Sequence, residues 1–86
     1  MYHVVMSSFE NYFYQNIGDR IKKYRESQGY TQEELSELLG KNLKYIGHIE
    51  RCERRVSTFM LMRILEIFKV APSEFFEFEQ QFSWED

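Results

Sequence analysis

Apolar residues recur every three or four positions along most of this chain, which is the spacing of one buried face of an α-helix. The first stripe comprises Phe9, Phe13, Ile17, Ile21 and Tyr24. Ser7 and Glu10 form a capping box before it, and Gly29 can end a helix after it. The pattern predicts one long helix over about residues 8–28, weakened at Gly18 by about 1 kcal/mol relative to alanine.

A second, shorter helix is predicted to begin at Thr31. The Thr31 hydroxyl can cap the helix while Glu34, three residues on, reaches back to the amide of the cap. Gly40 supplies the left-handed residue that ends a helix easily. The expected apolar face of this helix is Leu35, Leu38 and Leu39.

A third helix follows almost at once, because Asn42 offers a new N-cap only two residues after Gly40. Ile46 and Ile49 repeat the inward spacing. The positions expected on the opposite side are Leu43, Lys44, Gly47, His48 and Arg51. Two helices joined by so short a turn cross steeply, as in a helix-turn-helix.

Two more helices complete the predicted fold. Ser57 can cap a fourth helix whose buried stripe is Met60 or Leu61, Ile64, Leu65 and Phe68. Pro72 suits the first position of a fifth helix, although Ala71 is a poor cap before it. The expected architecture is a single compact all-α domain of five helices over residues 1–86, with flanking extensions at 1–16 and 77–86.

Four sequence features follow one another along the chain: TQEEL, the glycine after the leucine pair, YIGHIER and ILEIFKVAPSEFF. Together they resemble the Cro and lambda-repressor-like (Xre-type) helix-turn-helix family from about Ile17 to Phe76. The residues before Ile17 lengthen the first helix beyond what the resemblance explains. The family commonly has glycine where this chain has Cys52 and a proline-containing turn near Val56, so we expect a connection of different shape there.

The resemblance implies sequence-specific binding of double-stranded DNA by a repressor-like transcriptional regulator. Its base-reading positions would be Leu43, Lys44, Gly47 and His48, where donors can reach guanine and an apolar tip can touch thymine. An ordinary solvated helix face is the alternative. Phosphate contacts are implied for Gln32, Asn42, Tyr45, Arg51, Arg54 and Arg55. Paired surface charges are the alternative for the three arginines.

The resemblance also implies an ion pair between Arg25 and Glu50, joining the first helix to the end of the third. A homodimer on a palindromic operator is expected, with an interface drawn from Phe75, Phe76, Phe78, Phe82 and Trp84. These aromatics alternate with acidic residues and are too many for one small core. The rival hypothesis is an interaction module such as an antitoxin or antirepressor, with a protein partner and the same fold.

The formal net charge of −3 hides an uneven distribution. All eleven Lys and Arg lie between Arg20 and Lys69. The stretch from Asp19 to Lys69 also holds eight of the fourteen acidic residues, so it carries +3 and the flanks carry −6. A basic centre suits a nucleic-acid partner despite the acidic total.

Cys52 is the only cysteine, which indicates a reducing cytoplasm and no internal disulfide. A thiolate favoured by nearby arginines would be a redox sensor, whereas the plain interpretation is a small residue closing a helix. Its spacing from His48 is ligand-like, but two ligands make no metal site. We expect no metal, cofactor, membrane span or enzymatic activity.

Overall fold

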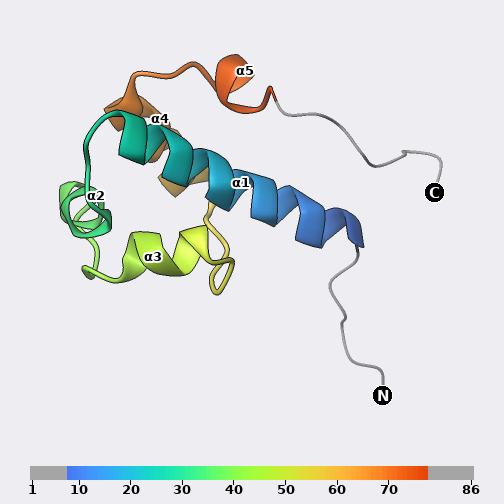
Figure 1. Ribbon diagram of the computed structural model, residues 1–86, viewed down its shortest axis with the longest axis horizontal. Helices are drawn as coiled ribbons and strands as arrows, with labels where there is room; N and C mark the ends of the chain where they lie inside the picture. Colours follow the sequence, from blue (N-terminus) through green and yellow to red (C-terminus); the bar gives the residue numbers. More distant parts are fainter. Residues whose placement is uncertain (1–7, 78–86) are drawn as a thin grey trace.

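The computed structural model describes residues 8–77, and all secondary structure within that range is helical. The bounds are α1 Ser8–Ser27, α2 Gln32–Leu38, α3 Tyr45–Glu50, α4 Thr58–Phe68 and α5 Pro72–Phe75. Figure 1 shows α1 crossing the molecule, with α2 and α3 on one side of it and α5 on the other. The prediction of an all-α fold of five helices with an extended first helix is confirmed.

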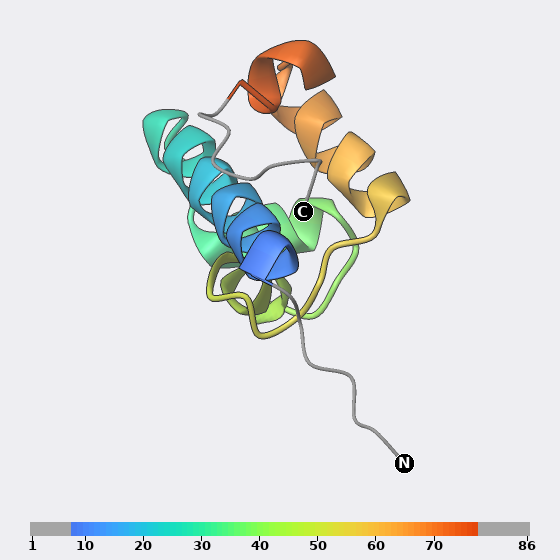
Figure 2. The ribbon, with the colours of Figure 1, turned by 90° about the vertical axis from the view of Figure 1, so that its right-hand side faces the viewer.

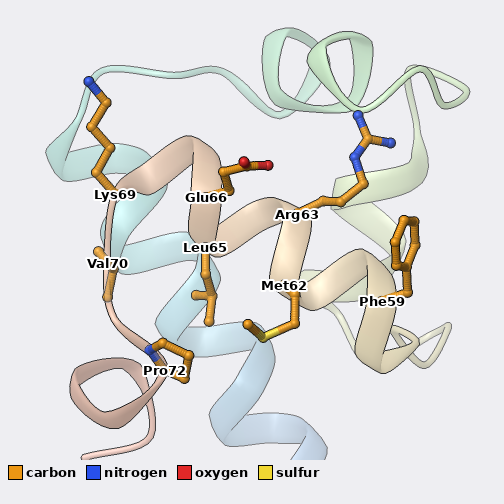
Figure 3. A pocket seen from close by; sticks show the side chains of 8 residues that line it. All are labelled: Phe59, Met62, Arg63, Leu65, Glu66, Lys69, Val70 and Pro72. Atoms are coloured by element: carbon orange, nitrogen blue, oxygen red, sulfur yellow. The ribbon is translucent and has the colours of Figure 1, made fainter.

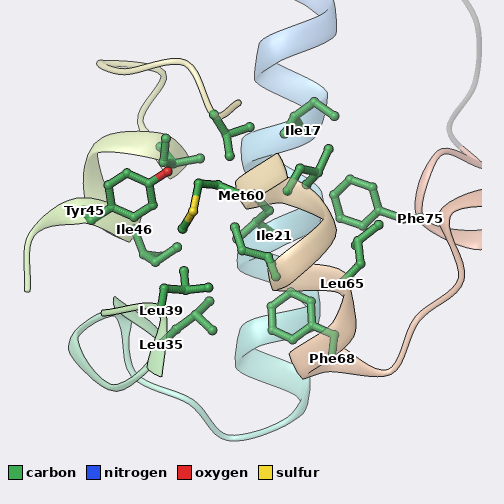
Figure 4. Packing of buried hydrophobic residues seen from close by; sticks show 14 residues of the cluster. Ile17, Ile21, Leu35, Leu39, Tyr45, Ile46, Met60, Leu65, Phe68 and Phe75 are labelled. Atoms are coloured by element: carbon green, nitrogen blue, oxygen red, sulfur yellow. The ribbon is translucent and has the colours of Figure 1, made fainter. Parts of the chain in front are cut away.

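The hydrophobic core lies where α1, α3 and α4 meet, and α2 and α5 close it from either side (Figure 4). The predicted stripe of α4 is buried, as are Ile17 and Ile21 of α1. Phe75 of α5 is completely buried, and its ring stacks on Tyr24 at a centroid distance of 6.0 Å. The core is therefore continuous from the helix-turn-helix to the fifth helix.

Local caps fix several helix ends as the sequence predicts. Thr31 and Glu34 form the capping box of α2, with hydrogen bonds of 3.0 and 2.8 Å. The Ser57 hydroxyl accepts the Met60 N–H at 3.1 Å, and Pro72 stands at the start of α5. These contacts span only three residues, which is why the sequence alone could specify them.

The predicted apolar face of α2 is wrong at one position. Leu35 and Leu39 are buried, but Leu38 is 52% exposed, and Ser36 is fully buried in its place. Successive residues advance by about 100° around a helix, so Ser36 and Leu38 lie on opposite flanks of the face centred on Leu35 and Leu39, at equal angles from its centre. The packing of α2 against its neighbours therefore decides that Ser36 is buried and Leu38 faces solvent.

The predicted cap of α3 is also wrong. Asn42 accepts the Lys44 N–H at 2.9 Å, which closes a turn before the helix, and α3 begins only at Tyr45. The hydroxyl of Ser36 on α2 accepts the buried Ile46 N–H at 3.0 Å instead. A side chain of the preceding helix therefore satisfies the N-terminus of α3.

At the other end of α3 the chain turns through a left-handed residue. The Glu53 N–H donates to the His48 carbonyl at 2.8 Å and the Cys52 N–H to the Ile49 carbonyl at 3.1 Å, which is a Schellman motif. Cys52 has φ +61°, the conformation that glycine adopts most easily. The cysteine thus closes the helix, as the plain interpretation of the sequence has it.

We expect Cys52→Gly to raise the free energy of unfolding by about 1 kcal/mol, because an L-residue in the left-handed region carries a cost of that order. Cys52→Ala is the matched control, since it removes the thiol but keeps the Cβ. Urea denaturation of both variants measures the difference. Equal stability of the glycine and alanine variants would show that this backbone carries no such cost.

The surroundings of Cys52 favour the neutral thiol over the thiolate. The thiol donates a hydrogen bond to the Tyr14 carbonyl oxygen at 3.4 Å. Burial raises the pKa of the Cys52 thiol, and the negative charge of Asp19 raises it further. Both effects act against the arginine-stabilised thiolate that the sequence left as an alternative.

The extension of α1 ahead of Ile17 packs on the rest of the domain. Tyr14 lies under the guanidinium of Arg55, 5.1 Å from its ring centroid, and Phe13 stacks on Phe76 at 6.4 Å. Figure 2, which looks nearly along α1 from its blue N-terminal end, shows α4 and α5 to the right of α1. The extra turns of α1 thus contact both the connection that follows α3 and the residue that follows α5.

Candidate nucleic-acid interface

The exposed side of the α2–α3 unit carries most of the predicted base-reading residues. Leu43 is 52% exposed and Lys44 is exposed, both in the turn immediately before α3. His48 is partly exposed in the middle of α3. Leu43 and Lys44 are consecutive, and His48 follows Lys44 by about one helical turn. Side chains with this spacing can lie along one edge of the helix, as contact with a DNA groove requires.

Gly47 is buried, because two other side chains cover it. A Cβ at this position would lie 3.0 Å from Nη1 of Arg51 and 3.1 Å from Oε1 of Gln32. The missing side chain therefore leaves room for a guanidinium and an amide on the same face of α3. Of the two side chains that cover Gly47, only Arg51 is charged.

The inner side of α3 is held by a buried ion pair between Arg25 and Glu50. Nε of Arg25 donates to Oε2 of Glu50 at 2.7 Å and its Nη2 to Oε1 at 3.2 Å. The two side chains are only 9% and 3% exposed. Arg25 also donates to the Tyr30 carbonyl at 2.8 Å, and the hydrogen bond to Glu50 raises the pKa of Arg25.

Gln32 joins this pair rather than standing free at the start of α2. Its Nε2 donates to Oε1 of Glu50 at 3.0 Å, so Glu50 receives hydrogen bonds from α1 and α2 at once. Every buried side-chain polar atom among residues 8–77 has a hydrogen-bond partner. The arrangement fixes the orientation of α3 against both helices.

The three arginines after α3 are exposed, and each has a partner in the protein. Arg51 pairs with Glu53 at 3.2 Å, and Arg55 pairs with Glu10 at 3.3 Å. Arg54 lies 5.2 Å from the ring centroid of Tyr45. Exposed pairs of this kind contribute about 0–1 kcal/mol, so phosphates can replace these partners at little cost.

Other predicted contact residues have mixed environments. Asn42 is exposed in the turn, where its oxygen accepts from Lys44. Tyr45 is buried, with Lys41 on its ring at 5.5 Å, and burial raises the pKa of Tyr45. Two cations thus border Tyr45 beside the first turn of α3.

The predicted dimer residues are separated by the structure. Phe75 lies inside the core of the single chain, whereas Phe76 is 37% exposed beside Phe13. Phe78, Phe82 and Trp84 lie outside the described residues.

Sequence reasoning missed Ser36, whose hydroxyl connects α2 to α3, and Gly18, which lets α1 approach α3. The signal for Ser36 is a small polar residue on the apolar face of α2. No helix within residues 8–77 combines the length and apolar composition needed to cross a bilayer.

The chain is similar to known regulators over most of its length. The sequence pattern of the helix-turn-helix family matches residues 21–75. A putative HTH-type transcriptional regulatory protein of Pyrococcus furiosus is 34% identical over 88% of this chain, which spans 25% of that protein. The uncharacterised HTH-type transcriptional regulator YazB of Bacillus subtilis is 32% identical over 66% of this chain and 83% of its own length.

A solved structure shares the fold. The restriction-modification controller protein C.AhdI of Aeromonas hydrophila superposes with a TM-score of 0.69 and 29% identity, over 76% of this chain and 98% of that one. The control protein C.SmaI of Serratia marcescens is 35% identical over 54% of this chain and 55% of its own length. The family is one of regulators rather than enzymes, in agreement with the sequence prediction. This chain belongs to the Xre-type helix-turn-helix family of DNA-binding transcriptional regulators.

Proposed function

We propose that this protein is a cytoplasmic repressor that binds a specific operator in double-stranded DNA, with α3 in the major groove. The observation that carries the proposal is the contrast between the two sides of α3. Its inner side is locked by Arg25, Glu50 and Gln32, while Leu43, Lys44 and His48 are presented outward. A rigid helix with an exposed polar edge can read base edges.

Phosphates on either side of the groove would contact the cationic rim. Arg51, Arg54 and Arg55 follow α3 directly, and their present partners are weak surface contacts. Gln32 keeps one amide hydrogen for a phosphate while the other serves Glu50. Asn42 and Tyr45 complete the proposed phosphate set at the start of α3.

Base reading and phosphate binding can be separated by substitution. Lys44→Ala and His48→Ala should each cost roughly 1–3 kcal/mol on the preferred site and relax the preference at one base pair. Arg54→Ala should weaken binding to all duplexes alike and lower the salt slope by about one unit. Fluorescence anisotropy on the selected and a scrambled duplex across a salt series measures both effects. Unchanged specificity ratios for Lys44→Ala and His48→Ala would overturn the base-reading assignment.

We further propose that the regulator acts as a homodimer on a palindromic operator. A groove of about 560 Å³ lies along α4 toward Pro72, lined by Phe59, Met62 and Leu65 (Figure 3). Phe59 is 71% and Met62 45% exposed. Arg63, Glu66 and Lys69 also line it, so a two-fold arrangement would place Glu66 of one copy against cations of the other.

The dimer interface could be formed by the α4 groove or by the aromatic tail, and substitutions can distinguish the two. Phe59→Ser with Met62→Ser should convert a dimer to a monomer if the groove is the seam, and a chain ending at Glu77 should do so if the tail is. Leu38→Ser is the control, since Leu38 is an exposed leucine on α2. Sedimentation velocity measures the mass. A full-length chain that stays monomeric at high concentration would rule out the dimer.

An interaction module is the second candidate, and the exposure of two leucines favours it. Leu38 and Leu43 are both 52% exposed, at the end of α2 and in the turn that follows. Apolar side chains there suit a protein partner as well as a thymine methyl. Loss of a protein complex in Leu43→Ala, with DNA specificity unaffected by Lys44→Ala, would support this second function.

A further inference from the structure

His48 does not stand alone on the exposed side of α3. Its Nδ1 lies 2.7 Å from Oε1 of Glu53, at the start of the α3–α4 connection. The same carboxylate accepts from Nε and Nη2 of Arg51 at 3.2 and 3.3 Å. One predicted base reader and one predicted phosphate contact therefore share a single acidic partner.

The chemistry of this contact determines where the imidazole carries its hydrogen. The hydrogen bonds from Arg51 and then His48 lower the pKa of Glu53, so its carboxylate is ionised near neutral pH. An ionised carboxylate has no hydrogen to give and can only accept. The hydrogen in the contact must therefore belong to Nδ1 of His48.

We propose that Glu53 is a positioning residue that sets the specificity of His48, by holding the neutral imidazole as the Nδ1–H tautomer. Nε2 then presents a bare lone pair. This is the opposite of the tautomer that dominates free histidine in water. The part of the proposal that concerns DNA rests on the proposed function, whereas the tautomer itself does not.

The tautomer decides which base suits His48. In the major groove guanine presents only acceptors at N7 and O6, whereas adenine N6 and cytosine N4 carry donor hydrogens. A bare Nε2 can accept from an amino group but repels the guanine edge. His48 should therefore select adenine or cytosine at the position it faces, rather than the guanine that a histidine donor would choose.

The tautomer can be measured without DNA. Imidazole ¹⁵N correlation spectra at pH 8, where an imidazole is neutral, should show Nδ1 protonated in the native protein. His48→Gln assigns the signals by leaving only His3. Glu53→Gln should restore the Nε2–H form, because an amide can donate as well as accept. Glu66 is an exposed carboxylate on α4, so Glu66→Gln is the matched control and should leave the tautomer of His48 unchanged. A native Nε2–H form, or a fully protonated ring, would overturn the proposal.

The consequence for DNA is tested by selecting sites from randomised duplexes at the same pH. The native protein should prefer adenine or cytosine at one position by roughly 5- to 100-fold, and Glu53→Gln should bring that preference close to one while keeping the others. An Nδ1–H spectrum with guanine selected there would overturn the role in specificity. If no duplex is enriched at all, the proposed function fails, and the spectra still decide the tautomer.

Discussion

Replacing Arg25 with methionine is expected to lower the free energy of unfolding by about 3–5 kcal/mol, because it leaves the buried carboxylate of Glu50 without its bidentate partner. Glu50 is 3% exposed and would keep only the hydrogen bond from Gln32. For a domain of this size such a loss is a large share of the total stability. Thermal and urea denaturation should show clearly lowered midpoints for the variant.

The double change Arg25→Met with Glu50→Gln should recover part of this loss, since no uncompensated charge is then buried. The exposed pair of Arg55 and Glu10 provides the matched control. The same substitutions there, Arg55→Met and Glu10→Gln, should change stability by about 0–1 kcal/mol. Additive effects at Arg25 and Glu50 would show that their contact contributes no coupling.

Gly18→Ala is expected to destabilise the protein by about 1–3 kcal/mol, although alanine is the better helix former by about 1 kcal/mol. A Cβ at this position would lie 2.9 Å from the carbonyl oxygens of both Ile49 and Glu50. These are backbone atoms of the last turn of α3, so no side chain can swing away. The two helices must move apart, so binding to the proposed operator should weaken as well.

Gly47→Ala is the matched control, because it also places a methyl group on a helical glycine. Its nearest neighbours are the flexible ends of Arg51 and Gln32, which can move. The free energy of unfolding should therefore change little or rise. Denaturation curves of the two variants separate backbone contact from helix propensity, and a Gly18→Ala variant as stable as the native protein would contradict the close packing of α1 on α3.

The sequence alone determined the helices and most of their ends. Periodic apolar residues and caps such as Thr31 with Glu34, or Pro72 at the start of α5, act within one helical turn, so they can be recognised without knowledge of the fold. The family resemblance likewise indicated Arg25 and Glu50 as partners 25 residues apart, which periodicity could not. The groove-facing positions came from the same source and stay predictions.

Only the tertiary structure decided how those helices are locked together. Ser36 caps α3 from α2, and Gly18, which propensity alone marks as a weak point, is the place where α1 meets the backbone of α3. Leu38 faces solvent because the direction in which a two-turn helix is buried depends on its neighbours. Glu53 meets His48 and Arg51 because a left-handed Cys52 folds the connection back over α3. Such contacts depend on angles between helices and on reversals of the chain, and no local pattern of residues encodes them.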